Sequence, residues 1–382
     1  IILFHRTGKE PPLTMKLICS KSNLLQGVNI VSKAVPTRTT MAILECILID
    51  ASADEIKLIA NDMELGIETM IEGDIVENGI IALDAKIFSE IVRKLPDNEV
   101  VIETDDSFKT VITCEKAKFN IIGKSGEDFS YLPYIEKNDP IAISQFTLKE
   151  VIRQTIFSIA DNDNNRLMTG ELFEINDNQL KVVSLDGHRI SIRNIELKDH
   201  YAHKKVVVPG KTLNEISKIL PGSVDEDVII YITDNHIIFE FMNTTVVSRL
   251  IDGEYFKIEQ MLSSDYETKL KINKRELLNC IDRATLLVKE GDKKPIIMDI
   301  RDNVMELKIN SFIGSMNEDI DIEKTGKDIL IGFNPKFFID ALRVIDEEEV
   351  SLYMVNPKAP CFIRDDDNQF IYLILPVNFN NV

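Results

Sequence analysis

The chain of 382 residues is too long for one ordinary hydrophobic core and predicts two or three domains. It contains 44 Lys and Arg against 63 Asp and Glu, a net charge of -19, so its surface should repel nucleic acid and anionic membranes unless positive charge is gathered locally. A hydrophobic content of 44% with 28% charged residues excludes an intrinsically disordered chain.

Apolar runs are short. The longest, such as Asp227–Ile232, have the length of strands, and none approaches the roughly 20 residues of a membrane helix, so we expect no membrane contact. Residues 1–14 lack the apolar core and cleavage site of a signal peptide, and we interpret them as a non-native extension before a start at Met15. The five cysteines are scattered and never paired as C-x-x-C, which argues against disulfides and a zinc site and favours the cytoplasm.

The predicted elements recur with a period near 125 residues. The first unit has helical patterns at 20–35 and 83–96, a strand at 57–60 and a Gly-acidic-aromatic segment at 126–129. The second repeats them at 146–160, 208–221, 171–183 and 253–256, and Asn176-Asp177-Asn178 predicts a turn between two antiparallel strands. The third has helices at 272–288 and 333–345, a strand at 306–310 and a buried final strand within 370–378, with Pro376 and Val377 emerging at an edge.

The later helix of each unit shows the repeat residue by residue. Three positions are in register: Lys86, Lys211 and Lys336; Glu90, Glu215 and Asp340; Leu95, Leu220 and Ile345. Apolar residues at three- and four-residue spacing indicate amphipathic helices packed on a flat surface. We therefore predict an α+β fold of three similar domains, 15–139, 140–265 and 266–382, each with two helices on antiparallel sheets.

Positive charge is concentrated in the helices. The windows 20–35, 83–95, 146–160, 208–220, 272–288 and 334–345 carry 14 Lys and Arg against 7 Asp and Glu, and each window is net positive. The remainder of the chain is therefore strongly acidic. Helices presented to a phosphate backbone would explain this division, and ordinary helical use of Lys and Arg is the competing explanation.

Catalytic patterns are weak. Asp186-Gly-His-Arg189 places an Asp near a His, but no G-x-S-x-G nucleophile accompanies it, and Asp-Gly is typical of a tight turn. His200 and His203 fall in a polar stretch that we interpret as a solvated loop and not as a metal site. Phosphate-binding and dinucleotide motifs are missing from the sequence. We expect neither an enzyme nor a cofactor nor a metal.

Several short motifs, in order and spacing, resemble the bacterial sliding clamp, the beta subunit of DNA polymerase III. They are 36–44 (PTRTTMAIL), Asn61-Asp-Met-Glu64, Asp186-Gly-His-Arg-Ile190, Ile251-Asp-Gly-Glu254, Ile331-Gly-Phe-Asn-Pro335 and Tyr372-Leu-Ile-Leu-Pro-Val377. The resemblance spans Met15 to about Phe379. It implies a head-to-tail homodimer closed into a ring, with helices lining the hole and sheets outside.

The resemblance also implies partners and sites. The partners are duplex DNA, a second copy of the chain, the alpha subunit of the replicative polymerase, the clamp loader and other proteins with short clamp-binding motifs. The implied peptide pocket comprises Met168, Leu185, Gly187, His188, Arg189, Ile190, Phe256, Met261, Asn334, Phe337, Leu373, Ile374, Leu375, Pro376, Val377 and Asn378. The implied DNA-facing residues are Arg38, Lys86, Arg166, Lys211 and Lys336.

The chain departs from the family pattern at the pocket. Phe256 and Gln260 stand where the family often has Pro and Arg, the C-terminal end is longer, and Arg166-Leu167 replaces an aromatic pair seen in some members. Two other functions stay open from the residues: an enzyme using Asp186 and His188, and an acidic scaffold that binds proteins without encircling DNA.

Overall fold

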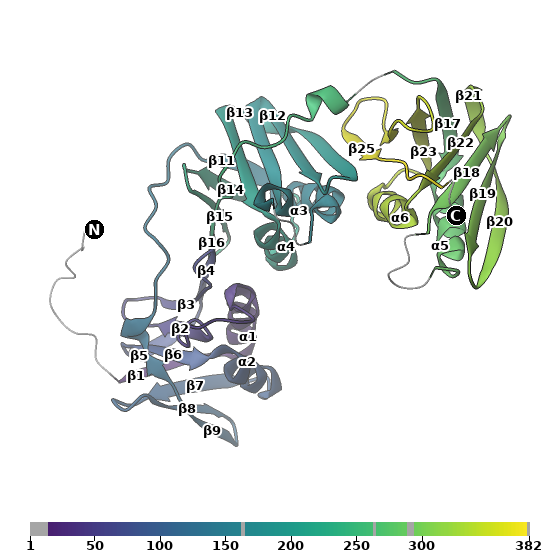
Figure 1. Ribbon diagram of the computed structural model, residues 1–382. Coiled ribbons are helices and arrows are strands. Elements are labelled where there is room, and N and C mark those ends of the chain that lie inside the picture. The colour runs from purple at the N-terminus through teal and green to yellow at the C-terminus, as the bar shows by residue number, and fades with distance from the viewer. Residues whose placement is uncertain (1–13, 162–164, 263–264, 289–293, 380–382) are drawn as a thin grey trace. The chain divides into compact units, whose positions relative to one another are not determined.

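The computed structural model describes residues 14–161, 165–262, 265–288 and 294–379 (Figure 1). Residues 1–13 of the N-terminal extension expected from the sequence lie outside the described residues. The chain forms two compact units, one built from residues up to 141 with 218–220 and 226–249, the other from 142–217, 221–225 and 250 onward. Each helix of the described part is too short or too polar to cross a membrane.

The first unit contains two antiparallel sheets covered by helices α1 (Lys21–Val31) and α2 (Ala85–Lys94), which contact each other. One sheet has the order β5-β1-β7-β8-β9 and the other includes the order β10-β6-β2-β3-β4-β16-β15-β14. The strands are β1 Met15–Ser20, β2 Cys46–Asp50, β3 Ile56–Asn61, β4 Leu65–Ile71, β5 Asp74–Glu77, β6 Ile80–Asp84, β7 Glu99–Thr104, β8 Lys109–Cys114, β9 Ala117–Ile122, β10 Lys124–Ser125, β14 Asp227–Ile232, β15 His236–Phe241 and β16 Thr244–Arg249.

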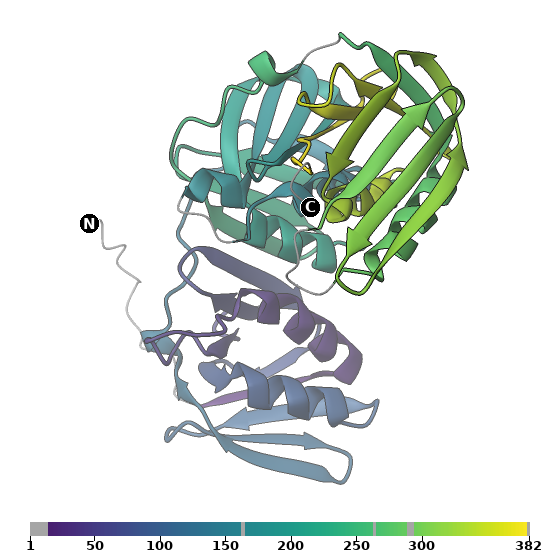
Figure 2. The same ribbon diagram turned by 45° about the vertical axis from the view of Figure 1, so that its right-hand side comes forward.

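The second unit repeats this design. Its helices are α3 (Gln145–Thr155), α4 (Gly210–Ile219, whose last residues belong to the first unit), α5 (Lys274–Thr285) and α6 (Pro335–Val344), and α5 and α6 lie side by side (Figure 2). The sheets have the orders β12-β13-β25-β24-β23-β17-β21 and β20-β19-β18-β22. The strands are β11 Ile141–Ser144, which begins in the first unit, β12 Gly170–Leu185, β13 Arg189–Pro209, β17 Thr268–Asn273, β18 Ile296–Arg301, β19 Val304–Ser311, β20 Gly314–Asp321, β21 Glu323–Gly326, β22 Ile329–Phe333, β23 Glu349–Met354, β24 Cys361–Arg364 and β25 Phe370–Ile374.

The same local chemistry starts most of these helices. Residues Ser20, Asp84, Ser144, Asn273 and Asn334 precede α1, α2, α3, α5 and α6, and each side-chain oxygen accepts a hydrogen bond from a backbone N–H of the first turn. Such caps satisfy donors that lack an intrahelical partner. Apolar residues at helical spacing then face the sheets, as Phe88, Ile91 and Val92 do in α2. The predicted helices are thereby confirmed, with ends shifted by a few residues.

The expected turn at Asn176-Asp177-Asn178 does not divide two strands, because β12 is assigned as one strand from Gly170 to Leu185. Its pairing with β13 is nevertheless interrupted there: Asn176 and Asn178 have no register partner in β13, a strand that is described in full, and the register shifts on either side of Asp177. Asp177 adopts a φ of 57°, a left-handed conformation that Asp tolerates. The residues of β13 opposite this position form an enlarged bulge in the ladder.

The expected solvated loop at His200 and His203 was also wrong, because both residues lie in β13 with exposed side chains. His200 Nδ1 lies 2.6 Å from Asp177 Oδ1, across the bulge. The described residues contain no group of three or more His, Cys, Asp or Glu arranged to hold a metal.

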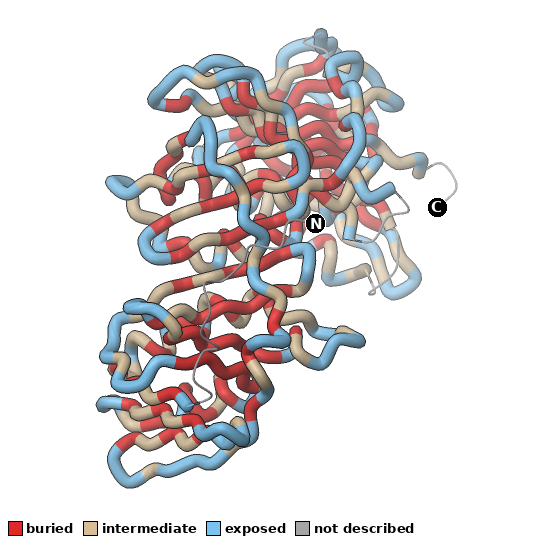
Figure 3. Tube along the Cα trace, turned by 90° about the vertical axis from the view of Figure 1, so that its left-hand side faces the viewer, coloured by how far each residue is buried: buried red, intermediate tan, exposed pale blue. Residues whose placement is uncertain are grey.

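Burial follows the strands, while the connections are mostly exposed (Figure 3). All five cysteines are buried and free. Burial raises the pKa of the Cys19 and Cys280 thiols to about 12. These groups are therefore protonated packing residues and not nucleophiles.

Candidate functional site

One candidate surface is a groove of about 650 Å³ along the exposed face of α1. Lys21 lines the groove from the start of α1, Lys33 from the 3-10 turn Ser32–Ala34 that follows α1, and Lys218 from the end of α4, with Asp97 as an acidic neighbour. The remaining lining is polar or modestly apolar, including Gln26 and Asn29. Cations on a wet groove attract phosphates without fixing them in one position.

The expected DNA-facing residues are all exposed: Arg38, Lys86, Arg166, Lys211 and Lys336. Lys86, Lys211 and Lys336 occupy the second position of α2, α4 and α6. Lys86 lines a different cavity, of about 590 Å³, together with Ile87 and Ile91 of α2 and Phe119 of β9. The basic groove on α1 was missed as a set of residues, although the excess of positive charge in windows 20–35 and 208–220 pointed to it.

A second candidate site surrounds the turn between β12 and β13. It consists of Asp186–Arg189 and the end of β25, and we call it the second corner because it lies in the second unit. The Asp186 carboxylate accepts hydrogen bonds from the backbone N–H groups of His188 (3.0 Å) and Arg189 (3.2 Å), and Gly187 has a φ of 84°. The backbone N–H of Leu375 donates to the His188 carbonyl at 2.9 Å. The predicted Asp-Gly turn is confirmed.

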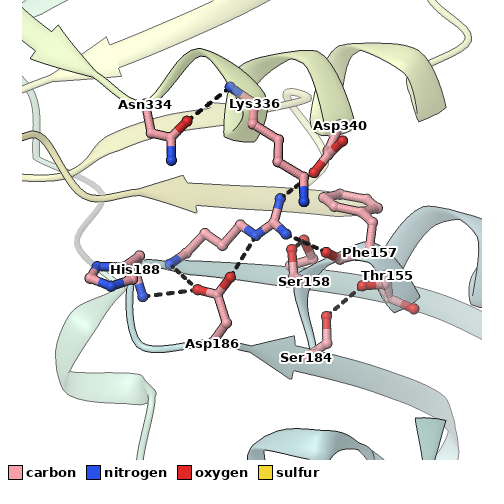
Figure 4. A network of polar contacts seen from close by, with 11 residues as sticks. Thr155, Phe157, Ser158, Ser184, Asp186, His188, Asn334, Lys336 and Asp340 are labelled. Carbon is pink, nitrogen blue, oxygen red and sulfur yellow. Dashed lines mark hydrogen bonds and ion pairs between the residues drawn. The ribbon is translucent and has the colours of Figure 1, made fainter. Parts of the chain in front are cut away.

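Asp186, Phe157 and Asp340 approach one another from three segments at this corner (Figure 4), and Arg189 hydrogen-bonds to all three. It is only 6% exposed, and its guanidinium donates to Asp186 Oδ2 (2.9 Å), to Asp340 Oδ2 of α6 (2.7 Å) and to the Phe157 carbonyl (2.5 Å). The guanidinium also lies 4.6 Å from the centre of the Phe337 ring. Buried charge is tolerated when it is paired and hydrogen-bonded in this way. Arg189 is therefore a structural link of the corner.

An apolar cluster brings together five of the expected pocket residues. Leu185, Ile190 and Leu373 are buried in it, and Met168 and Phe256 pack against it partly exposed. The cluster mixes side chains from the second and third predicted domains. Partly exposed apolar side chains over a rigid buried base are typical of a peptide groove.

The other expected pocket residues are not members of this cluster. His188 stacks on Phe337 with 6.2 Å between ring centres, and Asn334 caps α6 by accepting from Lys336 N–H at 3.1 Å. Ile374 is buried in a separate core, while Gly187, Met261, Leu375 and Asn378 are exposed and Pro376 and Val377 half-buried. The Val377 N–H donates to the Gly332 carbonyl at 2.8 Å, which holds the chain end against β22. The final strand, with Tyr372 and Ile374 buried, is confirmed.

Sequence reasoning missed further members of the apolar cluster. Leu167 and Leu262 pack against it partly exposed, and Tyr255 and Ile258 are buried within it. Gly253 has a φ of 130° and lies close to the Leu167 side chain. The recurring Gly-acidic-aromatic segment at 253–256 was the available signal, because it marks the chain that closes over this cluster.

Comparison with known proteins agrees with this architecture of repeated domains with paired helices on antiparallel sheets, which defines a DNA clamp. The family model of the DNA polymerase III beta subunit matches in three parts: the N-terminal domain at residues 15–133, the central domain at 142–257 and the C-terminal domain at 259–378. The chain belongs to the DNA polymerase III beta subunit family.

Relatives and solved structures support the assignment. The beta sliding clamp of Staphylococcus epidermidis is 34% identical over 376 residues, which is 95% of this chain and 99% of the relative. A solved structure attributed to the DNA polymerase III beta subunit of Eubacterium rectale is 84% identical with a TM-score of 0.93, covering 96% of this chain and 100% of that one. The sliding clamp of Bacillus subtilis is 35% identical with a TM-score of 0.92, covering 96% and 99%.

Proposed function

We propose that the protein is a DNA sliding clamp, a noncatalytic processivity factor that encircles duplex DNA and tethers the replicative polymerase. The observation that supports it most is the threefold repeat of clamp domains whose helices are basic in a chain of net charge -19. We place the domain boundaries at 15–139, 140–265 and 266–382. Because proteins of this family take part in DNA replication, we place this protein in the cytoplasm.

The α1 groove supports DNA encirclement over ordinary DNA binding. Its lysines come from the start of α1, the turn after it and the end of α4. A sparse set of cations attracts the duplex without fixing a register, while the acidic remainder of the surface limits binding elsewhere. A protein held by topology needs no tight contact and therefore remains free to slide.

Unpaired sheet edges support a head-to-tail homodimer. β9 and β20 are the edge strands of the first and last sheets. Beside β9, Ile122 is 83% exposed and Ile87 of α2 is 51% exposed, and Phe312 next to β20 is 94% exposed. β20 has an acidic sequence ending in Glu318-Asp-Ile-Asp321, whereas β9 is flanked by lysines. Two different, complementary edges favour a heterologous contact that closes into a ring.

The apolar cluster beside the second corner supports capture of short peptides from the polymerase alpha subunit, the clamp loader and other clamp-binding proteins. Met168 and Phe256 offer apolar contact, and the buried base and the Arg189 pairs hold the groove in shape before a peptide arrives. Such preorganisation lowers the cost of binding.

The same geometry argues against an enzyme based on Asp186 and His188. The Asp186 carboxylate is occupied by two backbone N–H groups and the Arg189 guanidinium, and the His188 ring stacks on Phe337. Asp186 therefore orients the turn and does not orient the imidazole as a general base would require.

Topological retention tests the proposal. The protein is loaded on nicked circular DNA with a matching clamp loader and ATP, and the DNA is then linearised. We expect retention on the circle and release after linearisation, whereas equal retention on both forms would contradict encirclement. A Lys21, Lys33 and Lys218 to Glu triple variant should be loaded in smaller amount at moderate salt, because the groove attracts the duplex less, while the rings that do close should still be released only after linearisation. A control with the same charge change at the exposed residues Lys198, Lys327 and Lys358, which lie outside the α1 groove, the β9 and β20 edges and the apolar cluster, should behave as wild type.

An acidic scaffold that binds only proteins makes a different prediction. It would bind partner peptides without retention on circular DNA, and the two triple variants would be indistinguishable from wild type. Sedimentation of the free protein separates the cases further, because a ring of two chains requires a stable dimer mass.

A further inference from the structure

The first unit contains a corner built like the second one. We name it the first corner; it consists of the β3–β4 turn, Asn61–Leu65, and the end of β16. Asp62 Oδ1 accepts from the backbone N–H groups of Glu64 (3.0 Å) and Leu65 (2.7 Å), as Asp186 does for His188 and Arg189. Met63 has a φ of 75°, close to the 84° of Gly187.

The neighbouring strand completes the correspondence. The backbone N–H of Arg249 donates to the Glu64 carbonyl at 2.9 Å, and at the second corner Leu375 donates to His188 at the same distance. Leu65 pairs with Ser248 as Arg189 pairs with Ile374. Arg249 therefore occupies the position of Leu375, and Met63 the position of Gly187.

A cavity of about 230 Å³ opens at the first corner. It lies between the β3–β4 turn, the segment Ser130–Pro133, and the β15 and β16 residues His236, Val247 and Arg249. Its volume matches one or two side chains and is too small for a folded partner. Leu132, Val247 and Met63 give it an apolar side.

Hydrogen bonds hold the cavity open without a ligand. Asn61 Nδ2 donates to the Ser130 carbonyl at 2.5 Å, and Asn61 Oδ1 accepts from Met63 N–H at 2.6 Å. Tyr131 donates its hydroxyl to Asp50 Oδ2 at 2.9 Å. A side chain at Gly66 would meet Leu132 Cδ2 at 2.0 Å, so this glycine lets the 130–133 segment lie close to the sheet. Preformed recesses of this kind are typical of binding sites.

The charges in the cavity favour an anion. Arg249 is exposed and forms no ion pair with any residue in the described part of the chain. Burial and the Arg249 charge together lower the pKa of His236, which favours its neutral form, so Arg249 is the positive charge of the cavity. Glu64 also lines the cavity but is not paired with Arg249. An incoming carboxylate would supply the partner that Arg249 lacks.

The conformation and exposure of Met63 are a second, independent indication that the cavity binds a ligand. A non-glycine residue at this φ is strained, yet the position is occupied by a large apolar side chain that is 53% exposed. Methionine adapts its shape to varied apolar partners. Strain and exposure of an apolar side chain at the mouth of a recess are common at binding sites.

We propose that the first corner is a second peptide site, which binds a short segment with an apolar side chain followed by a carboxylate. The apolar side chain contacts Met63, Leu132 and Val247, and the carboxylate pairs with Arg249. The analogy with the second corner rests on the peptide capture proposed above, whereas the cavity and its charges do not depend on it.

Methyl NMR of the full-length protein labelled on its methionines tests this site. The probes are acetyl-Gly-Leu-Asp-amide and its Asn counterpart, which differ mainly in one charge. We expect the Asp peptide to shift the Met63 methyl, assigned with Met63→Leu, and the Asn peptide to bind about tenfold more weakly, as expected for a lost charge-assisted pair. Met168 packs against the apolar cluster beside the second corner and reports that site in the same spectrum, so failure at one corner is distinguishable from failure at the other.

Two variants separate charge from shape. Arg249→Gln should weaken the Asp peptide about tenfold and leave the Asn peptide unchanged, and Glu64→Gln should bind the Asp peptide as well as wild type or better. A Met63 methyl that does not shift, or an affinity that is the same for both peptides and unaffected by Arg249→Gln, would overturn the proposal. Unchanged thermal unfolding of each variant excludes a trivial loss of structure.

Discussion

Glu171 at the start of β12 is fully buried, and neither carboxyl oxygen has a hydrogen-bond partner in the described part of the chain. Burial raises the pKa of this carboxyl from 4.5 to about 8, and the nearby Thr155 hydroxyl acts in the opposite direction. The folded protein thus holds a proton that the unfolded chain releases above its own pKa. The stability present at acid pH is lost as the pH rises toward 8 and changes little beyond.

We predict that Glu171→Gln removes this loss of folding stability with rising pH. At 1.36 kcal/mol per pKa unit, wild type should lose about 3 kcal/mol relative to the variant between about pH 5 and about pH 8. Gln keeps the shape of Glu but does not titrate, so its own burial cost is the same at each pH. The comparison therefore depends on how the slope of stability against pH differs between the two proteins, and not on the absolute stability of either one.

Amide hydrogen exchange of the β12 and β13 peptides, corrected for the intrinsic pH dependence, measures the local opening free energy in a protein that is not expected to unfold in one step. Glu174→Gln is the matched control on the same strand, because the Glu174 carboxylate is partly exposed and 3.8 Å from Lys205 Nζ. The control should keep the wild-type slope. Equal slopes for wild type and Glu171→Gln would refute the reasoning.

Three further outcomes follow from the structure. Arg189→Ala leaves Asp340 and the Phe157 carbonyl without their donor and should destabilise the second unit by about 3 kcal/mol, measured by thermal unfolding; a neutral result would show that the pairs do not hold the corner. Met63→Gly should stabilise the first unit by about 1 kcal/mol in chemical denaturation because it relieves the left-handed backbone, and a loss of stability would contradict the strain. Lys218→Gln should reduce the slope of log affinity against log salt for duplex DNA by about 0.9, and an unchanged slope would place Lys218 away from phosphate.

The repeated helices were predictable from the sequence because their signals are local. An N-cap residue followed by an apolar stripe at helical spacing appears in almost every copy, and packing on the sheets did not override it. The Asp186 turn was predictable for the same reason, since Asp and Gly determine a turn within four residues.

The errors fall where a distant partner decides the local structure. Asn176–Asn178 has the composition of a turn, but β12 continues through it, and its ladder with the distant strand β13 is interrupted there by a bulge. The place of Arg189 in the pocket stays a prediction, but its burial could not be foreseen, because it depends on Asp340 of a helix far away in the chain. Leu167 was missed because the apolar contacts that define its role come from residues far away in the chain.

The position of the repeated lysines has an electrostatic consequence. Lys86, Lys211 and Lys336 lie in the first turn of α2, α4 and α6, where the aligned peptide dipoles already concentrate positive potential. Each cation there opposes its own helix by about 0.3–1 kcal/mol. In the free protein each of these lysines is repelled by the N-terminal end of its own helix dipole. A bound anion, such as a phosphate, reduces this repulsion in the same way at all three helices. Binding and helix stability are thus coupled, so that any polyanion contacting these helices should also tighten their first turns.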